Sequence, residues 1–459
     1  MLKLIDDFVW GTPLIVFILF VGFILTIMLR GIQVTKLSLA VKSIFANDKS
    51  GKDGEVSSFG ALCMALSATI GTGNIVGVAT ALVAGGPGAL FWMWIAAFLG
   101  TATKYAESLL AIKYRVVEED GHVVGGPFYY IENGMGKKFK WLAKIFAIFG
   151  IGAGLLGIGT FTQINGITDA VKNFFDPSNA HMVNVFGMEY SWSVVVSGII
   201  ITVCAALVII GGVKRISSVS QVIVPFMAII YVSAVIVIIV THIADVPRVF
   251  VLIIESAFGL RAATGGALGA MMLAMQKGVA RGIFSNEAGL GSAPIAAATV
   301  KTDEPVEQGL VSMTGTVIDT LIICTMTGLA ILLTNTWDIG LEGVNVTIKA
   351  FQMGLPFPAQ VSSCILMLCL VFFAFTTILG WNYYSEKCVE YLVGNNPIII
   401  KIYRWIYILA IFIGPFMTVS AVWILADIFN GLMAFPNLIA LVALSGVVAA
   451  ETKKYFAKR

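Results

Sequence analysis

The chain has 459 residues, of which 58% are hydrophobic and 12% are charged, and its net charge is +3. A soluble protein of this size needs more polar surface than this composition supplies, so the sequence indicates an integral membrane protein and excludes a soluble globular domain. The 47 glycines agree with this assignment, because small residues let membrane helices approach each other closely.

Apolar segments of membrane length recur along the whole chain. A helical span needs about 20 mostly apolar residues. This rule predicts an all-α protein with eleven spans, at 8–30, 58–82, 88–112, 141–168, 190–212, 217–241, 264–296, 308–334, 359–386, 399–424 and 437–452. The last region is ambiguous, because Gly414-Pro415 and the segment 427–436 divide it into either two spans or three.

Lysines and arginines indicate the orientation, because cytoplasmic loops retain these cations. If successive spans cross the membrane in opposite directions, nearly all the lysines and arginines of the loops fall on one side of the membrane. The other side holds only Lys3, Lys172, Arg248, Arg261 and Lys349. This distribution places the N-terminus outside and the C-terminus in the cytoplasm, and it favours two spans after residue 398.

Two apolar segments are interrupted near the middle by glycine and polar residues. The first interruption lies within Ser67 to Gly77, and the second is predicted at Gln276 to Gly282. An unpaired backbone group in hydrocarbon costs several kcal/mol, so a helix breaks there only where protein, water or a solute takes over its hydrogen bonds. Breaks at matching positions in two halves of a chain are typical of a transporter with a site near the bilayer midplane.

The breaks fall in the second and seventh spans and divide the chain into four parts. These are an extra N-terminal helix with its cytoplasmic loop (1–57), a first five-helix repeat (58–242), a second five-helix repeat with a preceding extracellular helix (243–452), and a cytoplasmic tail (453–459). Because five is odd, the two repeats enter the membrane from opposite sides and form an inverted repeat if they share a fold. The stretches 245–260 and 343–355 are predicted as short amphipathic helices on the outer surface.

The first break would present donors to an acid. Its outer half-helix begins at the midplane, so the N–H groups of Thr72, Gly73 and Asn74 suit a carboxylate, and the carbonyls from Ser67 to Ile70 suit a cation. The alternative is a packing face, because Gly73 and Gly77 form a G-x-x-x-G pattern.

The second break would present acceptors to an amine. Its outer half-helix ends at the midplane, so the carbonyls from Met275 to Gly278, with Gln276 among them, suit an ammonium group. Together the two breaks describe the head group of a zwitterionic amino acid. A compact sugar or osmolyte also fits such dipoles.

Several charged residues fall inside the predicted spans. A charge at the bilayer centre costs roughly 3 kcal/mol or more, so we expect such residues to face the protein interior and to pair. The sequence suggests Arg281 with Glu287, either as a gate or as a structural ion pair. Asp319, and Glu107 one helical turn from Lys104, are similar cases.

Polar residues in two other spans are further candidates. Thr376 and Thr377 interrupt an apolar run. Threonine hydroxyls in membrane helices usually bond to the preceding turn, but neutral oxygens beside a helix break also suit sodium. Gln163 and Asn165 lie in the outer half of the fourth span, where they either line the pathway or bridge helices.

Three stretches resemble one transporter family. The run Gly85-Gly-Pro-Gly-Ala-Leu-Phe-Trp-Met-Trp-Ile-Ala-Ala-Phe-Leu-Gly100 is similar to the signature of the alanine or glycine:cation symporters, and Gly71–Asn74 and Gly278–Ser292 resemble that family's two broken helices. The resemblance implies a leucine-transporter-like inverted repeat with one extra N-terminal helix, which imports a small neutral amino acid with sodium. By this analogy, the substrate carboxylate meets Thr72, Gly73 and Asn74, sodium meets the carbonyls of Ser67 and Ile70 and the hydroxyls of Thr376 and Thr377, and Phe161 and Trp381 line the pocket.

The function expected from the sequence is a secondary active symporter of the plasma membrane. No nucleotide motif is present, so energy comes from an ion gradient, with sodium as the co-transported ion and no organic cofactor. Proton-coupled transport of another small zwitterion is the alternative. A channel would need a continuous polar pore lining, and an enzyme would need paired acids, a His cluster or an activated nucleophile. We expect an amino acid substrate, a lipid surrounding, no nucleic acid and no protein partner, and hence a monomer.

Overall fold

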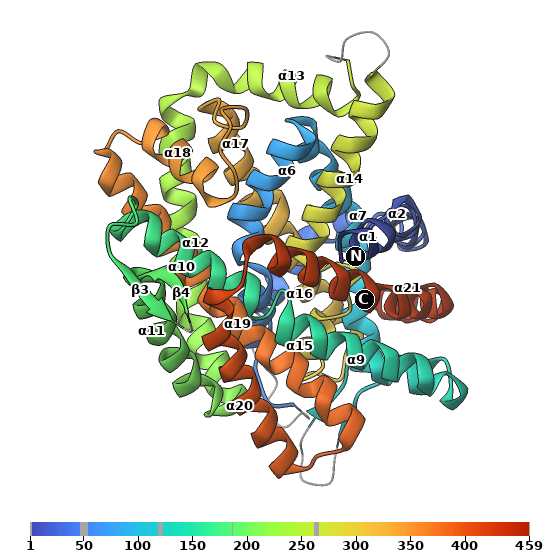
Figure 1. The fold of residues 1–459 in the computed structure, drawn as a ribbon. Coiled ribbons are helices and arrows are strands. Elements are labelled where there is room, and N and C mark those ends of the chain that lie inside the picture. Colours follow the sequence, from blue (N-terminus) through green and yellow to red (C-terminus); the bar gives the residue numbers. More distant parts are fainter. Residues whose placement is uncertain (1, 46–53, 118–122, 186, 261–265, 459) are drawn as a thin grey trace.

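The computed structural model describes residues 2–45, 54–117, 123–185, 187–260 and 266–458, which form a helical bundle with two short hairpins (Figure 1). Strand β1 (Val116–Val117) pairs antiparallel with β2 (Val123–Val124), and β3 (Met182–Val185) pairs with β4 (Met188–Ser191). The helices of the first half are α1 (Leu2–Val9), α2 (Thr12–Met28), α3 (Ile32–Thr35), α4 (Leu37–Ile44), α5 (Ser58–Thr69), α6 (Val78–Gly85), α7 (Gly88–Lys113), α8 (Pro127–Tyr129), α9 (Lys140–Leu156), α10 (Phe161–Phe175), α11 (Trp192–Ile209) and α12 (Gly212–Thr241). Those of the second half are α13 (Val246–Ala257), α14 (Ala267–Asn286), α15 (Ala293–Ala297), α16 (Pro305–Thr316), α17 (Thr325–Leu333), α18 (Val344–Gly354), α19 (Ala359–Val393), α20 (Pro397–Ile413) and α21 (Val419–Ala457).

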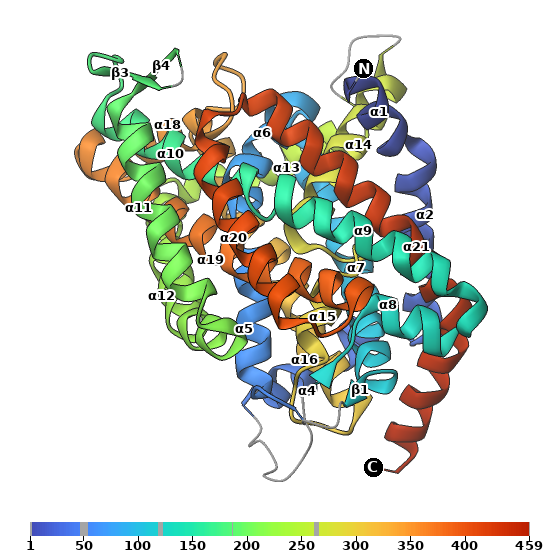
Figure 2. The same ribbon diagram turned by 60° about the horizontal axis from the view of Figure 1, so that its bottom comes forward.

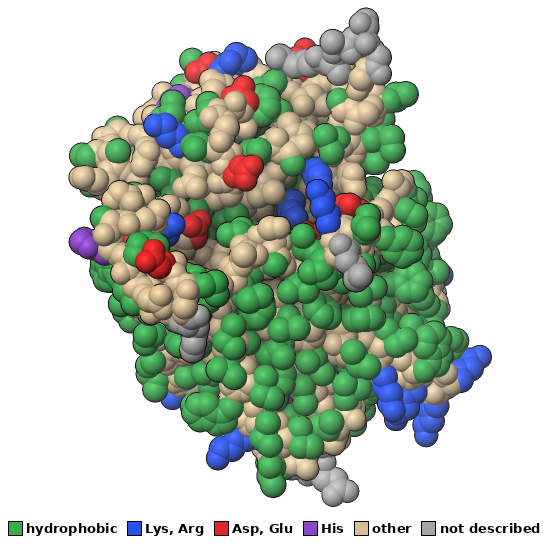
Figure 3. All heavy atoms as spheres, viewed as in Figure 1, with side chains coloured by type: hydrophobic (Ala, Val, Ile, Leu, Met, Phe, Trp, Pro, Cys, Tyr) green, Lys and Arg blue, Asp and Glu red, His purple; other side chains and the backbone are tan. Residues whose placement is uncertain are grey.

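The outer surface of the bundle is apolar. Figure 3 shows hydrophobic side chains over most of the surface around α9, α20 and α21, with Lys and Arg side chains gathered at its margins. Elsewhere large apolar side chains stay exposed, including Ile199, Ile200, Val203 and Leu207 on α11 and Val222, Phe226 and Ile229 on α12. Contiguous apolar surface of this extent would be insoluble in water, so it marks the area that lipid covers.

The structure supports part of the expected span count. Among the described residues, eight helices are long and apolar enough to cross a membrane, or nine if the bent pair α5 and α6 is one span. The two further spans expected from the sequence correspond to α7 and to α14 with α15. Helix α7 has 26 residues but carries Lys104, Glu107 and Lys113, which lower its hydropathy. The count of eleven therefore stays a prediction.

The two termini lie at opposite ends of the bundle. Figure 2 shows the N-terminus on the same side as the β3–β4 hairpin, and the C-terminus on the same side as α4 and β1. We call these sides the N-terminal face and the C-terminal face. Of the few cations expected on the outer side, Arg261 lies outside the described residues.

Several sequence predictions about element boundaries can be compared directly with the structure. Two helices follow residue 396, as the lysine and arginine distribution favours, but the division is at 414–418, and α21 continues through Pro436 to Ala457. The stretches 245–260 and 343–355 are helical, as α13 and α18. The predicted fourth span is not continuous, because the turn Gly157 to Thr160 separates α9 from α10. In the eighth span, a π-helical segment, Val317–Cys324, joins α16 to α17.

Glycine allows α5 and α19 to pack closely at mid-length. A Cβ atom on Gly380 would lie 2.7 Å from Ala68 Cβ and 2.9 Å from the Ala68 backbone, closer than van der Waals contact allows. This contact fixes the separation between the broken helix and the helix that carries Thr376 and Thr377.

We predict that Gly380→Ala destabilises the protein, because overpacking of this kind costs typically about 1–3 kcal/mol. The matched control is Gly446→Ala, on the exposed side of α21, where a Cβ atom meets nothing within 4 Å. Thermal unfolding in detergent should show a lower Tm for Gly380→Ala alone. Equal Tm values for the two variants would contradict this account.

Candidate functional site

The first predicted break is confirmed. Helix α5 ends at Thr69, Ile70 is extended (ψ 94°), and the chain resumes as a π-helical segment, Gly73–Gly77, that leads into α6. The two half-helices are bent by 52° relative to each other, and Figure 2 shows α5 below α6. The polar residues between them lie deep in the protein, with Thr72 and Asn74 fully buried.

Side chains take over the hydrogen bonds that this break releases. The Gly71 N–H donates to Asn74 Oδ1 (2.9 Å), and the Thr72 N–H donates to Gln163 Oε1 (3.0 Å). Gln163 comes from α10, and its Nε2 donates to the Ile158 carbonyl in the turn between α9 and α10 (2.9 Å). Gln163 therefore connects the first break to the unpredicted turn in the fourth span.

A cavity of 520 Å³ reaches the first break. Thr72 lies at its base, where the Thr72 Oγ1 is buried and has no hydrogen-bond partner among the described residues. The other polar and charged residues of the lining are Thr80, Thr162, Asn165, Asp169, Arg281, Glu342 and Asn345. An unpartnered hydroxyl beside a cavity still has a hydrogen bond to offer, so the substrate contact expected for Thr72 stays a prediction.

Of the four residues expected to hold sodium, only Ile70 and Thr377 have their oxygen atoms close together. Thr377 Oγ1 lies 3.2 Å from the Ile70 carbonyl oxygen, across the α5–α19 contact. Thr376 Oγ1 points instead toward Met227 Sδ on α12 (3.7 Å) and bonds to the preceding turn of α19. Ser67 is fully buried, and its hydroxyl donates to the Met64 carbonyl within α5.

Gly71 lets the backbone of the first break approach this oxygen pair closely. A Cβ atom at position 71 would lie 2.4 Å from Thr377 Oγ1 and 2.8 Å from Gln163 Oε1. Any side chain here would therefore collide with the Thr377 hydroxyl and the Gln163 amide. The absence of a side chain lets these neutral oxygens approach the Ile70 carbonyl, and neutral oxygens gathered in this way suit a small cation.

The second break is not where the sequence analysis placed it. Helix α14 is continuous through Gln276 to Gly282, and the chain leaves the helix only at Glu287 (φ 57°). Gly289 (φ 88°) and Gly291 (φ 80°) continue the loop up to the short helix α15. Positive φ angles favour glycine, so the signal for this break was the Gly-Leu-Gly that follows Glu287.

The glycines that suggested the wrong position serve close helix packing. A Cβ atom on Gly278 would lie 2.2 Å from the Ala89 carbonyl oxygen on α7, and one on Gly282 would lie 3.4 Å from Met93 Cα. This spacing is the G-x-x-x-G pattern of a packed helix pair. Gln276 lies toward the N-terminal segment, with its Nε2 3.5 Å from the Trp10 carbonyl oxygen. Neither Gln276 nor Gly278 lies where the predicted substrate contact requires.

The predicted pair between Arg281 and Glu287 is also wrong. Arg281 forms two hydrogen bonds to the Asp427 carboxylate on α21, Nη1 to Oδ1 at 2.9 Å and Nη2 to Oδ2 at 2.6 Å. Its guanidinium also lies over the rings of Phe284 and Trp423. Glu287 follows the end of α14 in a left-handed conformation, and its carboxylate bonds Trp381 and Ser292 instead of Arg281.

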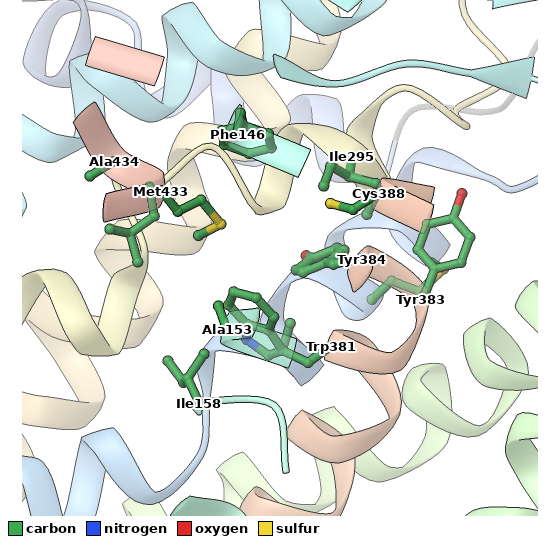
Figure 4. Close-up of a cluster of buried hydrophobic side chains, with 14 of the residues drawn as sticks. Phe146, Ala153, Ile158, Ile295, Trp381, Tyr383, Tyr384, Cys388, Met433 and Ala434 are labelled. Atoms are coloured by element: carbon green, nitrogen blue, oxygen red, sulfur yellow. The ribbon is translucent and has the colours of Figure 1, made fainter. Parts of the chain in front are cut away.

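Glu287 joins the second break to α19. Its Oε1 accepts a hydrogen bond from Trp381 Nε1 (2.7 Å), and its Oε2 accepts from the Ser292 hydroxyl. Figure 4 shows Trp381 close to Ala153 and Ile158, which belong to α9 and the turn that follows it. Trp381 therefore lies where α19, the second break and this turn meet.

A second carboxylate, that of Glu107 on α7, binds the loop that follows α14. Glu107 Oε1 on α7 accepts hydrogen bonds from the N–H groups of Gly289 and Gly291, both at 3.1 Å. Asn437 Nδ2 on α21 donates to the same oxygen (2.6 Å). The backbone N–H groups of Gly289 and Gly291, which have no helical partner at the second break, are thus bonded by a residue of the first half of the chain.

Asp319 is a buried acid of the site region whose partners the sequence did not reveal. Its carboxylate accepts from Asn74 Nδ2 (2.7 Å), Ser285 Oγ (2.8 Å) and Thr320 Oγ1 (2.7 Å). Asn74 therefore connects the first break to the π-helical segment. An acid in an apolar span indicated a buried network, but no local pattern named its partners.

The last turn of α14 lies directly against the first break. A Cβ atom on Gly73 would lie 3.2 Å from a Phe284 ring carbon and 3.3 Å from Ser285 Cα. Phe161 lies away from this contact, packed on Gly414 and near Ala410 and Val422. The two breaks are thus adjacent, although the second is further along the chain than predicted.

Comparisons with known proteins agree with this arrangement. The family model of the sodium:alanine symporter family matches residues 1–459. The chain belongs to the sodium:alanine symporter family. An uncharacterized transporter of Haemophilus influenzae is 54% identical over 457 residues, covering 99% of this chain and 95% of that protein. The sodium/alanine symporter AgcS of Methanococcus maripaludis is 44% identical over 460 residues, covering 98% and 96%.

Structural similarity extends to a more distant transporter. The crystal structure of MhsT in complex with L-phenylalanine matches with a TM-score of 0.55 at 13% identity, covering 88% of this chain and 99% of that one. This likeness shows a leucine-transporter-like fold. As a member of the sodium:alanine symporter family, the protein is a multi-pass membrane transporter of amino acids and not an enzyme.

For this sodium:alanine symporter family member, we predict that Gly71→Ala abolishes alanine uptake without unfolding the protein. The added methyl group would collide with Thr377 Oγ1 and Gln163 Oε1 and push them out of their positions beside the Ile70 carbonyl. Gly269→Ala is the matched control, because a Cβ atom there meets nothing within 4 Å. Wild-type uptake of labelled alanine by Gly71→Ala in proteoliposomes would rule out this group of oxygens as part of the site.

Proposed function

We propose that this protein imports small neutral amino acids, alanine and glycine, together with sodium by alternating access. The observation that carries this proposal is the first break, where the free Thr72 hydroxyl lies at the base of the cavity and the Ile70 carbonyl faces the Thr377 hydroxyl. The family and the AgcS relative support sodium as the co-transported ion. The plasma membrane is the proposed location, with the N-terminus outside.

The substrate carboxylate would bind at Thr72 and Gly73. The Thr72 N–H now donates to Gln163 Oε1, so a carboxylate would take the place of the Gln163 amide oxygen as acceptor. Asn74 holds the break in shape, since its side chain bonds both the Gly71 N–H and Asp319. Its role is therefore one of positioning.

The substrate ammonium group would bind at the end of α14. This helix ends at Asn286, where its last carbonyls lack intrahelical partners and form the negative end of the helix dipole. Phe284 and Ser285 pack on Gly73, so these carbonyls lie close to the donors of the first break. This assignment replaces the carbonyls around Met275 to Gly278.

Sodium would bind between the Ile70 carbonyl and Thr377. Thr376 would join only after its hydroxyl turns away from Met227. Oxygen ligands of this kind carry no net charge, so the ion's charge would be compensated by acidic groups nearby.

The arrangement of helices supports an inverted repeat. In the first repeat (58–242), the broken pair α5 and α6 is followed by α7, by the α9–α10 pair, and by α11 and α12. In the second repeat (243–452), the broken pair α14 and α15 is followed by the α16–α17 pair and by α19, α20 and α21. Two such halves of opposite orientation would let one central site face each side of the membrane in turn.

A direct test is uptake of labelled alanine into proteoliposomes, with an inward sodium gradient compared with a proton gradient alone. We expect accumulation against the alanine gradient only with sodium. Asn74→Ala should abolish it, because the break loses its bonds to Gly71 and Asp319, while the folded fraction stays unchanged by size-exclusion chromatography. Accumulation driven by protons alone would instead favour the proton-coupled alternative, and uptake without accumulation would favour a channel.

The Arg281–Asp427 pair is proposed as a gate over the base of the cavity. Arg281 and Trp423 both line the cavity, and the guanidinium stacks on Phe284 and Trp423. Arg281→Lys keeps the charge but loses the two-point bond and the planar stacking. We expect several-fold faster release of bound alanine at an unchanged Tm. A lowered Tm with unchanged release would instead assign the pair a structural role.

A further inference from the structure

Trp10 joins the N-terminal segment to a helix at the other end of the chain. The residue lies between α1 and α2 and is 6% exposed. Its indole Nε1 donates a hydrogen bond to the Asp427 carbonyl oxygen on α21 (2.7 Å). A buried indole N–H needs an acceptor, so this bond fixes the position of the N-terminal segment on α21.

The indole reaches α21 because Gly431 has no side chain. A Cβ atom at position 431 would lie 2.3 Å from Val9 Cγ1 and 3.3 Å from Trp10 Nε1. Gly431 follows Asp427 by about one helical turn, so Val9 and Trp10 lie against the turn of α21 that begins at Asp427. Helix α1 packs on α21, and Figure 1 shows the start of the chain beside that helix.

Trp10 also contacts the helix that carries Arg281. Its backbone carbonyl oxygen lies 3.5 Å from Gln276 Nε2 on α14. This contact is weaker than the indole bond, since N–H···O bonds are usually about 2.7–3.2 Å long. One residue of the N-terminal segment therefore touches both helices whose side chains form the Arg281–Asp427 pair.

The Arg281–Asp427 pair depends on where the backbone of Asp427 lies. Two guanidinium nitrogens bond the two carboxylate oxygens, at 2.9 Å and 2.6 Å, and such a two-point arrangement is geometrically specific. The bond from Trp10 holds the carbonyl oxygen of the same aspartate, and so holds the turn from which its carboxylate extends. Because Arg281 lines the cavity, a shift of this turn would disturb the pair at the cavity wall.

We propose that Trp10 positions the Arg281–Asp427 pair and thereby sets the rate at which substrate leaves the cavity. Trp10 is not among the residues that line the cavity, so it is a positioning residue that acts through Asp427. The extra N-terminal helix is then a part of the gate. The inference rests on the proposed function, because it requires the pair to act as that gate.

The test is the release of labelled alanine from the purified protein, after dilution into unlabelled alanine with sodium present. Trp10→Phe keeps an aromatic ring at this position and removes the N–H donor. The net loss of one hydrogen bond changes an equilibrium constant by about two- to tenfold. We therefore expect release to accelerate about two- to tenfold in Trp10→Phe.

Trp92→Phe is the matched control. Trp92 Nε1 also donates to a backbone carbonyl, that of Ala257 (3.1 Å), and Trp92 does not line the cavity. The control therefore loses the same kind of bond, between α7 and α13. We expect changes in Tm of similar size in the two variants, and faster release in Trp10→Phe alone. Equal release rates in both variants would overturn the inference.

A double variant separates positioning from a general loosening of the protein. Arg281→Lys removes the two-point bond that Trp10 supports, so adding Trp10→Phe should not accelerate release further. Effects that multiply in the double variant would refute the positioning role and leave the gate in place. If Arg281→Lys alone releases alanine at the wild-type rate, the proposed gate and this inference fail together.

If Trp10→Phe gives no folded protein, Gly431→Ala decides. The added methyl group would collide with Val9 Cγ1 and crowd Trp10 Nε1, which moves the indole away from the Asp427 carbonyl. We expect faster release in this variant and no further effect in the Arg281→Lys background. Release at the wild-type rate would contradict the inference. Wild-type protein that binds no alanine would instead overturn the proposed function, before any variant is compared.

Discussion

A helix that stops inside hydrocarbon leaves backbone groups that only the protein can satisfy, and the rest of this structure depends on how that is done. At the first break, Asn74 and Gln163 accept from the N–H groups of Gly71 and Thr72. At the second break, Glu107 accepts from the loop that follows α14. Each interruption is stable because a side chain from the same break or from a distant helix replaces the missing backbone acceptor.

The side chains that replace these backbone acceptors also bind the two halves of the chain together. Asn74 lies in the first half of the chain and reaches Asp319 in the second half, whereas Glu107 in the first half holds the loop after α14 in the second half. Trp381 and Glu287 add a further bond between α19 and the second break. A change at either break is therefore transmitted to the other through a few buried polar residues.

The sequence was sufficient for features that depend on local composition. Membrane character follows from apolar length, and the first break follows from Gly71, Gly73 and Asn74 with the polar Thr69 and Thr72 beside them. The family resemblance follows from three short stretches of sequence. The second break was misplaced because Gly278 and Gly282 have the same composition signal but serve close packing on α7. One glycine pattern has two physical uses, and only the tertiary neighbour distinguishes them.

Partner assignments could not be predicted for the same reason. Arg281 had a nearby acid along the chain, but its actual partner, Asp427, is on α21. The turn at Gly157 to Thr160 was overlooked although glycine occurs repeatedly just before it, since a glycine-rich helix and a glycine-rich turn look alike in sequence. The role of Thr377 beside Ile70 could be inferred from the resemblance, whereas the orientation of Thr376 toward Met227 could not.

The contact between Gly278 and the Ala89 carbonyl has a consequence for motion. Two helices whose backbones meet without intervening side chains resist sliding past each other, so we infer that α7 and α14 form one rigid body. The loop from Glu287 to Ser292 follows directly, and its glycines at 289 and 291 adopt positive φ angles that the absence of a Cβ atom permits. We infer that this loop is the hinge of the second half, and that Glu107, which is mounted on the rigid body, sets its resting angle.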